Sequence, residues 1–296
     1  MSVASIPAGA MSVAASTTHH MKASRRVWSA LGWAATGLSL VLLSVLMLWI
    51  LAVVFLRGAS ALSLSLFTTI TQGNGGGLLN AIEGTVVLSF GAMLLAVPIG
   101  VGAGIYISEY RHTTWAGVIR FLADVLVGVP SIVMGYFGYV TMIDWLGWGF
   151  SVAAGSIILA IICLPYICRT TELALEQVPN ALREAGYALG ASEPRVILRI
   201  ILPSVLPGIL TGIMLALAVS IGETAPLLYT AGWSNYLWDG RLTHSPIGYL
   251  TYAVYTFINE PFASANALAY AAAFLVTGFV LLINIVSRFV FDRRHK

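Results

Sequence analysis

The sequence predicts an all-α integral membrane protein with six transmembrane helices. Hydrophobic residues make up 58% of the chain and charged residues only 9%, whereas soluble domains carry about 25% charged residues. A helix needs about 20 apolar residues to cross a bilayer, and the chain offers six such segments. Almost all of the basic residues lie in the segments that this topology places on one side of the membrane.

The first apolar segment is an uncharged run at residues 27–56, preceded by three basic residues. It is longer than the 7–15 apolar residues of a secretory signal, so we expect a retained transmembrane helix. Residues 1–26 have no apolar periodicity and are expected to form a disordered tail. Residues 27–78 then comprise the first helix and an external loop.

The other five apolar segments fall within a predicted transmembrane domain at residues 79–290. They lie at residues 84–108, 117–143, 150–168, 204–228 and 263–287. Glycines four residues apart allow helices to approach closely, and they occur as Gly100 with Gly104 and Gly208 with Gly212. Prolines in or beside these segments predict kinks whose freed carbonyls need new partners: Pro98, Pro130, Pro165, Pro207 and Pro226.

The distribution of charge predicts the orientation. Of the fifteen Lys and Arg residues, only Arg57 and Arg241 fall on one side in the six-helix topology. By the positive-inside rule the opposite side is cytoplasmic. We therefore expect a multi-pass protein of the bacterial cell membrane, with the tails at 1–26 and 291–296 and the loop at 176–203 in the cytoplasm.

Sequence signatures of catalysis are missing. The lysines are Lys22 and Lys296, and neither follows a glycine-rich loop, so a Walker-type nucleotide site is excluded. The histidines lack zinc-ligand spacing and no nucleophile elbow occurs. Cys163 and Cys168 lie in one apolar segment, where they are best interpreted as buried side chains that only contribute to packing. We expect a protein that is not an enzyme, binds no cofactor or metal and does not bind nucleic acid.

One charged, helix-forming stretch interrupts the apolar sequence at residues 179–203, here called the EAA segment. Pro179 suits the start of a helix and Gly190 its end. The helix presents an apolar stripe, with Arg183 and Glu184 expected to point away from it; the stripe comprises Leu182, Ala185, Ala188 and Leu189. A second helix is predicted from Ser192-Glu193-Pro194. Two short helices joined by a sharp turn form a ridge that fits a groove in another protein, or an amphipathic hairpin on the lipid surface.

The spacing in this segment resembles the EAA loop of bacterial ABC-importer permeases of the MetI-like family. The matching positions are Glu184, Ala185, Gly186, Gly190, Ile200, Leu202 and Pro203. Gly186 departs from the second alanine that is common in the family. The resemblance implies a MetI-like permease fold and a second homologous permease subunit. It also implies two ATPase subunits that dock at residues 180–201 and use ATP and Mg, so that this loop couples ATP hydrolysis to transport.

Two further stretches resemble the phosphate-specific permeases of this family, most of all the PstA type. They are Gly128-Val129-Pro130-Ser131-Ile132-Val133 and Ile221-Gly222-Glu223-Thr224-Ala225-Pro226-Leu227. This resemblance implies the import of inorganic phosphate delivered by an external phosphate-binding protein. Val219 stands where a basic residue is expected in such permeases.

Charged residues in the apolar segments are the candidates for the translocation pathway. A charge near the bilayer centre costs about 2.5–3.5 kcal/mol, so Glu223 needs a protein or water-filled setting and suits an arginine partner. Arg169 and Glu172 are spaced to pair on one helix face, as are Arg120 and Asp124. The guanidinium of Arg169 suits either contact with phosphate or an interfacial ion pair with Glu172.

Other interpretations remain. The aromatic-rich loop at residues 229–262 suits a belt at the membrane interface or the mouth beneath a substrate-binding protein. The chain suits a permease for another oxyanion or small solute as well as for phosphate. An ion-coupled secondary transporter would use Glu223 as its coupling site, and a membrane enzyme is the weakest alternative.

Overall fold

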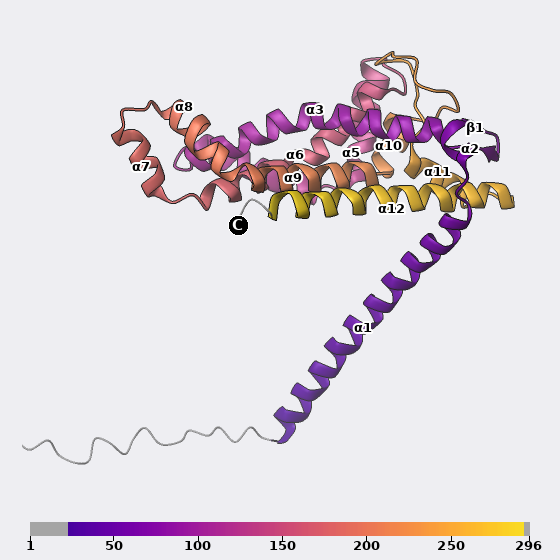
Figure 1. Cartoon of the computed structure of the whole chain (residues 1–296), viewed down its shortest axis with the longest axis horizontal. Helices are drawn as coiled ribbons and strands as arrows, with labels where there is room; N and C mark the ends of the chain where they lie inside the picture. The colour runs from indigo at the N-terminus through magenta and orange to yellow at the C-terminus, as the bar shows by residue number, and fades with distance from the viewer. Residues whose placement is uncertain (1–22, 293–296) are drawn as a thin grey trace, which may run out of the picture. The chain divides into compact units, whose positions relative to one another are not determined.

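The computed structural model describes residues 23–292, which fall into two compact units divided between Ala52 and Val53 (Figure 1). Helix α1 (Ala23–Ser60) begins in the first unit. Its side chains from Val27 to Ile50 are exposed although almost all are apolar, as a lipid-facing helix requires. The predicted tails lie mostly outside the described residues.

The helices confirm the predicted all-α membrane fold. Five helices among the described residues are long and apolar enough to cross a bilayer, and a bent pair raises the number to six. The long helices of the second unit are α3 (Leu79–Glu109), α6 (Val152–Glu176), α9 (Leu202–Gly222) and α12 (Ala263–Asp292). Figure 1 shows them lying roughly side by side.

The third predicted crossing is broken rather than continuous. Helix α4 (Thr114–Gly128) and helix α5 (Ser131–Gly138) with its π-helical extension η1 (Tyr139–Trp145) are bent by 102°. Val129 adopts an extended conformation, φ −79° and ψ 125°, because the residue before a proline is pushed out of the helical region. The predicted kink at Pro130 is therefore a complete change of direction.

The fifth predicted crossing is also broken, five residues before its expected end. Helix α9 stops at Gly222, Glu223 is extended, and α10 (Ala225–Thr230) restarts with Pro226 in its first turn. Proline is favoured in the first turn because the N–H group that it lacks would have no acceptor within the helix there. Pro98, Pro165 and Pro207, in contrast, lie inside helices α3, α6 and α9.

Helix α6 is the centre of the bundle, packed between α3 and α9. A Cβ atom built on Gly104 of α3 would lie 2.6 Å from Cβ of Thr171, and one on Gly212 of α9 would lie 1.9 Å from Oγ1 of Thr170. Neither contact leaves room for a side chain. The glycine pairs predicted to allow close approach do so, and both use α6 as their partner.

Two groups of short elements lie at opposite ends of these helices (Figure 1). The EAA end carries α7 (Asn180–Ala188), α8 (Glu193–Val196) and the π-helical turn η2 (Ile197–Ile201). The loop end carries α2 (Leu64–Thr68), an antiparallel pair β1 (Thr71–Gln72) and β2 (Gly75–Gly76), residues 231–249 and α11 (Leu250–Phe257). Thr71 lies opposite Gly76.

The aromatic loop at residues 229–262 is more than an interfacial belt. Tyr249 is only 1% exposed and belongs to the main core with Leu88 and Leu159. Trp233 stacks on Tyr252 with ring centroids 4.7 Å apart. The expectation of a simple belt was wrong for these side chains, because the segment folds back and packs on α3 and α12.

Candidate functional site

The EAA segment folds into the two short helices that its sequence predicts. Helix α7 begins after Pro179 and its last turn is closed by Leu189. Gly190 then has φ +75°, a backbone conformation that other residues adopt only at a cost. Its N–H donates to the carbonyl of Tyr187 at 2.9 Å, which terminates the helix in the usual way.

Two matching positions of the EAA pattern contact each other. A Cβ atom on Gly186 would lie 2.9 Å from Cδ1 of Ile200 and 3.0 Å from Cγ2 of Val196. Gly186 is buried, and below it an apolar cluster joins α6 to α8 and η2. The spacing between Gly186 and Ile200 therefore reflects the close packing of α7 on the helix that leads back into the membrane.

Arg183 points toward the protein, on the side of α7 away from the apolar stripe, as predicted. Its Nη2 lies 2.9 Å from Oε1 of Glu109, and only 17% of the Arg183 side chain and 8% of the Glu109 side chain are exposed. The guanidinium also donates to the carbonyls of Val178 and Leu175, at 2.8 Å and 3.2 Å. Helix α7 approaches the protein through Gly186, and Arg183 lies one turn before it on the same face.

The predicted apolar stripe consequently faces outward. Leu182 is 38% exposed and Leu189 is 87% exposed, and Glu184, Ala185 and Ala188 are exposed as well. We call this surface the α7 outer face, comprising Leu182, Glu184, Ala185, Ala188 and Leu189. Within the described part of the chain it stays exposed, although its apolar pattern is the kind that helices normally bury.

The second helix of the segment is tied to the same place as the first. The Glu193 carboxylate lies beside the hydroxyl of Tyr110, and its interaction with that hydroxyl, with its negative charge, raises the pKa of Tyr110 above its usual value. Glu109 and Tyr110 are consecutive at the end of α3. Both short helices are thus anchored on one turn of α3.

A buried carboxylate joins two arginines near the EAA end. Glu172 of α6 has a side chain that is 2% exposed, and each of its oxygens takes a different guanidinium. Arg169 donates Nη1 to Oε2 at 2.7 Å, as predicted. Arg120 of α4 donates Nε to Oε1 at 2.8 Å, and its predicted partner Asp124 is not the residue it binds. Arg169 remains 49% exposed.

The two stretches that carry the phosphate-permease resemblance meet in space. Ser131, at the start of α5, lies within hydrogen-bonding reach of the Glu223 carboxylate. A Cβ atom on Gly135 would lie 2.4 Å from Cα of Pro226. Thr251 donates to the carbonyl of Glu223 at 2.7 Å. The helix breaks of the third and fifth crossings therefore form one joint, which sequence reasoning missed because the residues are far apart along the chain.

Glu223 and Arg169 belong to different places. Arg169 is next to Thr170, which packs on Gly212 of α9. Glu223 lies about 16 Å beyond Gly212, at a rise of 1.5 Å per residue. Among the side chains that the structure describes, residues 27–287, no arginine forms an ion pair with Glu223. The predicted pathway residues thus divide into the Arg120–Glu172–Arg169 cluster and the joint at Glu223.

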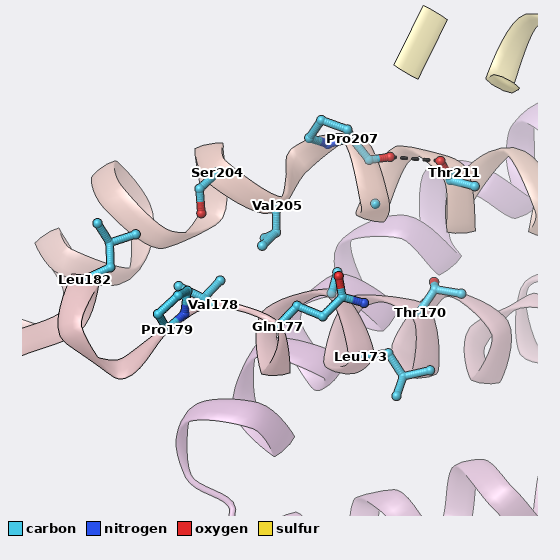
Figure 2. Close-up of a pocket in the computed structure, with 12 residues that line it drawn as sticks. Thr170, Leu173, Gln177, Val178, Pro179, Leu182, Ser204, Val205, Pro207 and Thr211 are labelled. Atoms are coloured by element: carbon cyan, nitrogen blue, oxygen red, sulfur yellow. Dashed lines mark hydrogen bonds between the residues drawn. The ribbon is translucent and has the colours of Figure 1, made fainter. Parts of the chain in front are cut away.

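A groove of about 530 Å³ opens between α6 and α9 at the base of the EAA segment. Thr170 of α6 and Gln177 just after it line one side, and Ser204 and Val205 of α9 line the other. Figure 2 shows Leu182 of α7 at one end. Thr211 donates to the carbonyl of Pro207 at 2.9 Å. Sequence reasoning missed this groove, because it depends on how α6 and α9 are spaced around their contacts at Gly208 and Gly212.

Comparison with known proteins places this architecture in a family. Residues 96–296 match the family described as "Binding-protein-dependent transport system inner membrane component". The chain belongs to this family. The match includes the EAA segment, the Arg120–Glu172–Arg169 cluster and the joint at Glu223, so the features described above lie within the family's common region.

Relatives resemble the permease over most of its length. A "Phosphate transport system permease protein PstA 2" of Mycobacterium tuberculosis is 46% identical over 266 residues, covering 90% of this chain and 88% of the relative. A "Phosphate transport system permease protein PstA" of Yersinia pestis is 42% identical over 256 residues, covering 84% of each.

Solved structures share the fold. The methionine ABC transporter MetNI, in an inward-facing form, gives a TM-score of 0.62 at 18% identity, covering 73% of the permease and 95% of the other chain. A bacterial ABC transporter that imports the polysaccharide alginate gives 0.54 at 16% identity, covering 90% and 99%. The predicted MetI-like ABC permease fold is thereby confirmed.

Proposed function

We propose that this permease is the transmembrane subunit of an ATP-driven ABC importer for inorganic phosphate. It forms half of the translocation pathway, beside a second homologous permease subunit. Two ATPase subunits dock on it from the cytoplasm, and an external phosphate-binding protein delivers the substrate. Relatives that are 46% and 42% identical over most of the chain carry the name of a phosphate transport permease, and this supports the choice of substrate.

The observation that carries the coupling role is the α7 outer face. An apolar helix surface costs free energy in water, about 25 cal/mol for each Å² left exposed. Leu189, at 87% exposure, contributes nothing to the packing of this chain. A groove in an ATPase subunit would cover it, with Glu184 at the rim. Residues 180–201 then form the docking surface, and both termini share its cytoplasmic side.

Anchoring on α3 gives this surface a mechanical role. ATP-driven closure of the two ATPases would displace α7 and α8, and the displacement would pass to α3 through the Arg183–Glu109 and Glu193–Tyr110 contacts. Because α3 packs along α6, the motion would reach the central helix. ATP and Mg act in the partner subunits, and this chain contributes coupling and a pathway without covalent chemistry.

Arg169 is the residue of this chain best suited to contact phosphate. One of its five N–H donors binds Glu172, and about half of its side chain is exposed. A guanidinium presents paired donors that match an oxyanion. Glu172, Asp124 and Glu176 all act on Arg169, so the free donors of its exposed guanidinium, rather than a surplus of positive charge, are what it offers to an anion. Glu223 is a poor phosphate ligand and suits an arginine of the neighbouring permease subunit.

Uptake by cells lacking their own phosphate permease tests the substrate. Expression of this chain with its partner subunits should restore uptake of labelled phosphate, and sulfate should not compete. Uptake of sulfate in its place would make the chain a permease for another oxyanion. Uptake that persists when the ATPase subunits are omitted would favour an ion-coupled secondary transporter with Glu223 as its coupling site.

Substitution in the EAA segment tests the coupling. Glu184→Arg places the opposite charge at the rim of the α7 outer face, and Gly190→Pro removes the turn that separates α7 from α8. Both should reduce transport by about tenfold or more, the effect of losing 1.4 kcal/mol, while ATP hydrolysis continues. Wild-type transport in both variants would refute docking through this segment, and Arg111→Gln, which changes an exposed arginine outside residues 180–201, serves as the control.

Arg169→Gln tests the phosphate contact. The variant keeps a hydrogen-bond donor but removes the charge, so phosphate flux should fall more than the amount of assembled complex. Flux and assembly are measured in the same membranes. An equal loss of both would mean that Arg169 only anchors α6 through Glu172.

A further inference from the structure

A small polar cavity lies beside the helix break at Glu223. The space within it that is open to the centre of a water molecule is about 10 Å³, close to the roughly 10–15 Å³ that one water needs. It is lined from α3, α6, α9, α10 and the segment entering α11. Five of its side chains carry a hydroxyl group: Thr85, Ser89, Ser220, Tyr249 and Thr251.

Two of these hydroxyls have no hydrogen-bond partner within the described residues. They belong to Ser220, which is 2% exposed, and Tyr249, which is 1% exposed. Thr85 and Thr251 differ, because Thr85 donates to the carbonyl of Ala81 and Thr251 to that of Glu223. A buried hydroxyl without a partner loses the free energy of its hydration, so two such groups on one cavity point to a ligand that serves both.

We propose that the cavity binds one water molecule that bridges the hydroxyls of Ser220 and Tyr249. Buried waters make about three hydrogen bonds each, and the hydroxyls of Ser89 and Thr85 line the same cavity as further partners. The space suits a single small molecule with both donors and acceptors. Phosphate, with its five heavy atoms, is too large for it, so the cavity is not a phosphate site and the proposal does not depend on the proposed function.

The position of the water gives it a structural role. Ser220 lies in the last turn of α9, three residues before Glu223. Tyr249 immediately precedes α11, and the cavity wall also includes Glu223 itself. The water therefore links the end of α9 to the segment that Thr251 already ties to the Glu223 carbonyl, and it holds the broken fifth crossing in place.

The sign of a stability change tests the proposal. If a water serves both hydroxyls, Ser220→Ala and Tyr249→Phe each remove one of its partners. Each should lower the melting temperature of the assembled transporter by about 2–4 °C, the shift expected for one hydrogen bond in a chain of this size. The double variant should lose less than the sum, because the two hydroxyls share one ligand.

Thr171 supplies the matched control. Its hydroxyl is also buried without a partner, and Thr171 lines no part of this cavity. Thr171→Val removes an unpartnered hydroxyl outside this cavity, so the melting temperature should stay the same or rise. If Ser220→Ala and Tyr249→Phe behave as Thr171→Val does, the cavity is dry and the proposal is overturned.

Direct observation and salt exchange complete the test. A density map of the assembled transporter that resolves ordered waters should show a peak within hydrogen-bonding distance of both hydroxyls; an empty cavity in such a map would overturn the proposal. Replacement of sodium by choline should not change the melting temperature. A fall in the wild type that is absent in Ser220→Ala would identify a cation instead of water.

Discussion

The two ends of the permease are held together by different interactions. At the EAA end, ion pairs with a buried carboxylate join separate helices, through Glu109 with Arg183 and through Glu172 with Arg120. At the loop end, Asn80 binds Thr71 and the carbonyl of Ser234. The ion pair formed there within the described residues, Asp239 with Arg241, is exposed at 3.5 Å.

This difference indicates which end is able to move. A charge pair keeps much of its attraction when its partners shift by an ångström or rotate, whereas interdigitated packing does not. At the loop end, a Cβ atom on Gly84 would lie 1.8 Å from the carbonyl oxygen of Gly248, so α3 and residues 231–249 are in direct backbone contact. We therefore expect the EAA end to transmit motion and the loop end to act as a fixed frame.

The largest effect should follow from Arg183→Met, which breaks the anchor of α7. Loss of one partner from a fully buried ion pair costs about 3–5 kcal/mol, and we expect about 2–3 kcal/mol here because Arg183 keeps some contact with solvent. Transport per ATP hydrolysed should collapse while the loop end stays intact. The measurements are reconstituted transport, ATPase rate and hydrogen exchange of residues 231–249.

Two variants make this test specific. Arg111→Met removes an exposed arginine outside residues 180–201 and should leave coupling near the wild-type level. The exchange Arg183→Glu with Glu109→Arg restores opposite charges across the same contact and should recover part of the transport. Equal losses in Arg183→Met and Arg111→Met would show that the buried pair does not anchor the segment.

The sequence predicted the elements of the EAA end but not the direction they face. Pro179 and Gly190 act through local backbone rules, so the start and stop of α7 could be predicted from the residues alone. The face of α7 that packs on the rest of the chain could not be predicted in this way. A count of apolar residues favours burial of the stripe that contains Leu182 and Leu189. The face that packs is chosen by Gly186, whose missing side chain permits the approach of Ile200, and Arg183 follows it inward.

Sequence analysis identified both of the stretches that form the joint at Glu223, but it did not show that they are in contact. The stretch around Ser131 and the stretch around Glu223 were each recognised by resemblance. Their contact depends on two helix breaks, and a proline predicts that a helix is disturbed without specifying a bend of 102°. Arg120 illustrates the same limit, since its partner Glu172 lies on another helix and Asp124 is the neighbour that helical spacing favours.

Gly84→Ala should have the next largest effect, and it tests the fixed frame. Close backbone contact leaves no room for the added methyl group, and overpacking of this kind costs about 1–3 kcal/mol. The melting temperature should fall while transport per ATP hydrolysed in the surviving complex stays near wild type. Gly102→Ala on the same helix is the control, because a Cβ atom there meets nothing within 4 Å. Loss of coupling in Gly84→Ala at unchanged stability would contradict the division between the two ends.

The smallest effect concerns Asp239 and its exposed loop. Its Oδ1 accepts hydrogen bonds from the N–H of Arg241 at 3.0 Å and the hydroxyl of Ser245 at 2.8 Å. These bonds, the one from the Arg241 N–H foremost, hold the pKa of Asp239 below its ordinary value, near 3.9 in the unfolded chain. The order they give the loop is therefore fully present above about pH 4 and is lost as the pH falls through the lower folded pKa.

Hydrogen exchange of residues 236–248 should show protection of the Arg241 amide that disappears on acidification. Asp239→Asn should reduce this protection at pH 7 and remove its pH dependence below about pH 4, because a neutral amide oxygen accepts a weaker hydrogen bond than a carboxylate. Transport and the melting temperature should not change. A clear fall in either would mean that this surface contact helps to hold the loop end, against the view that close packing at Gly84 is what fixes it.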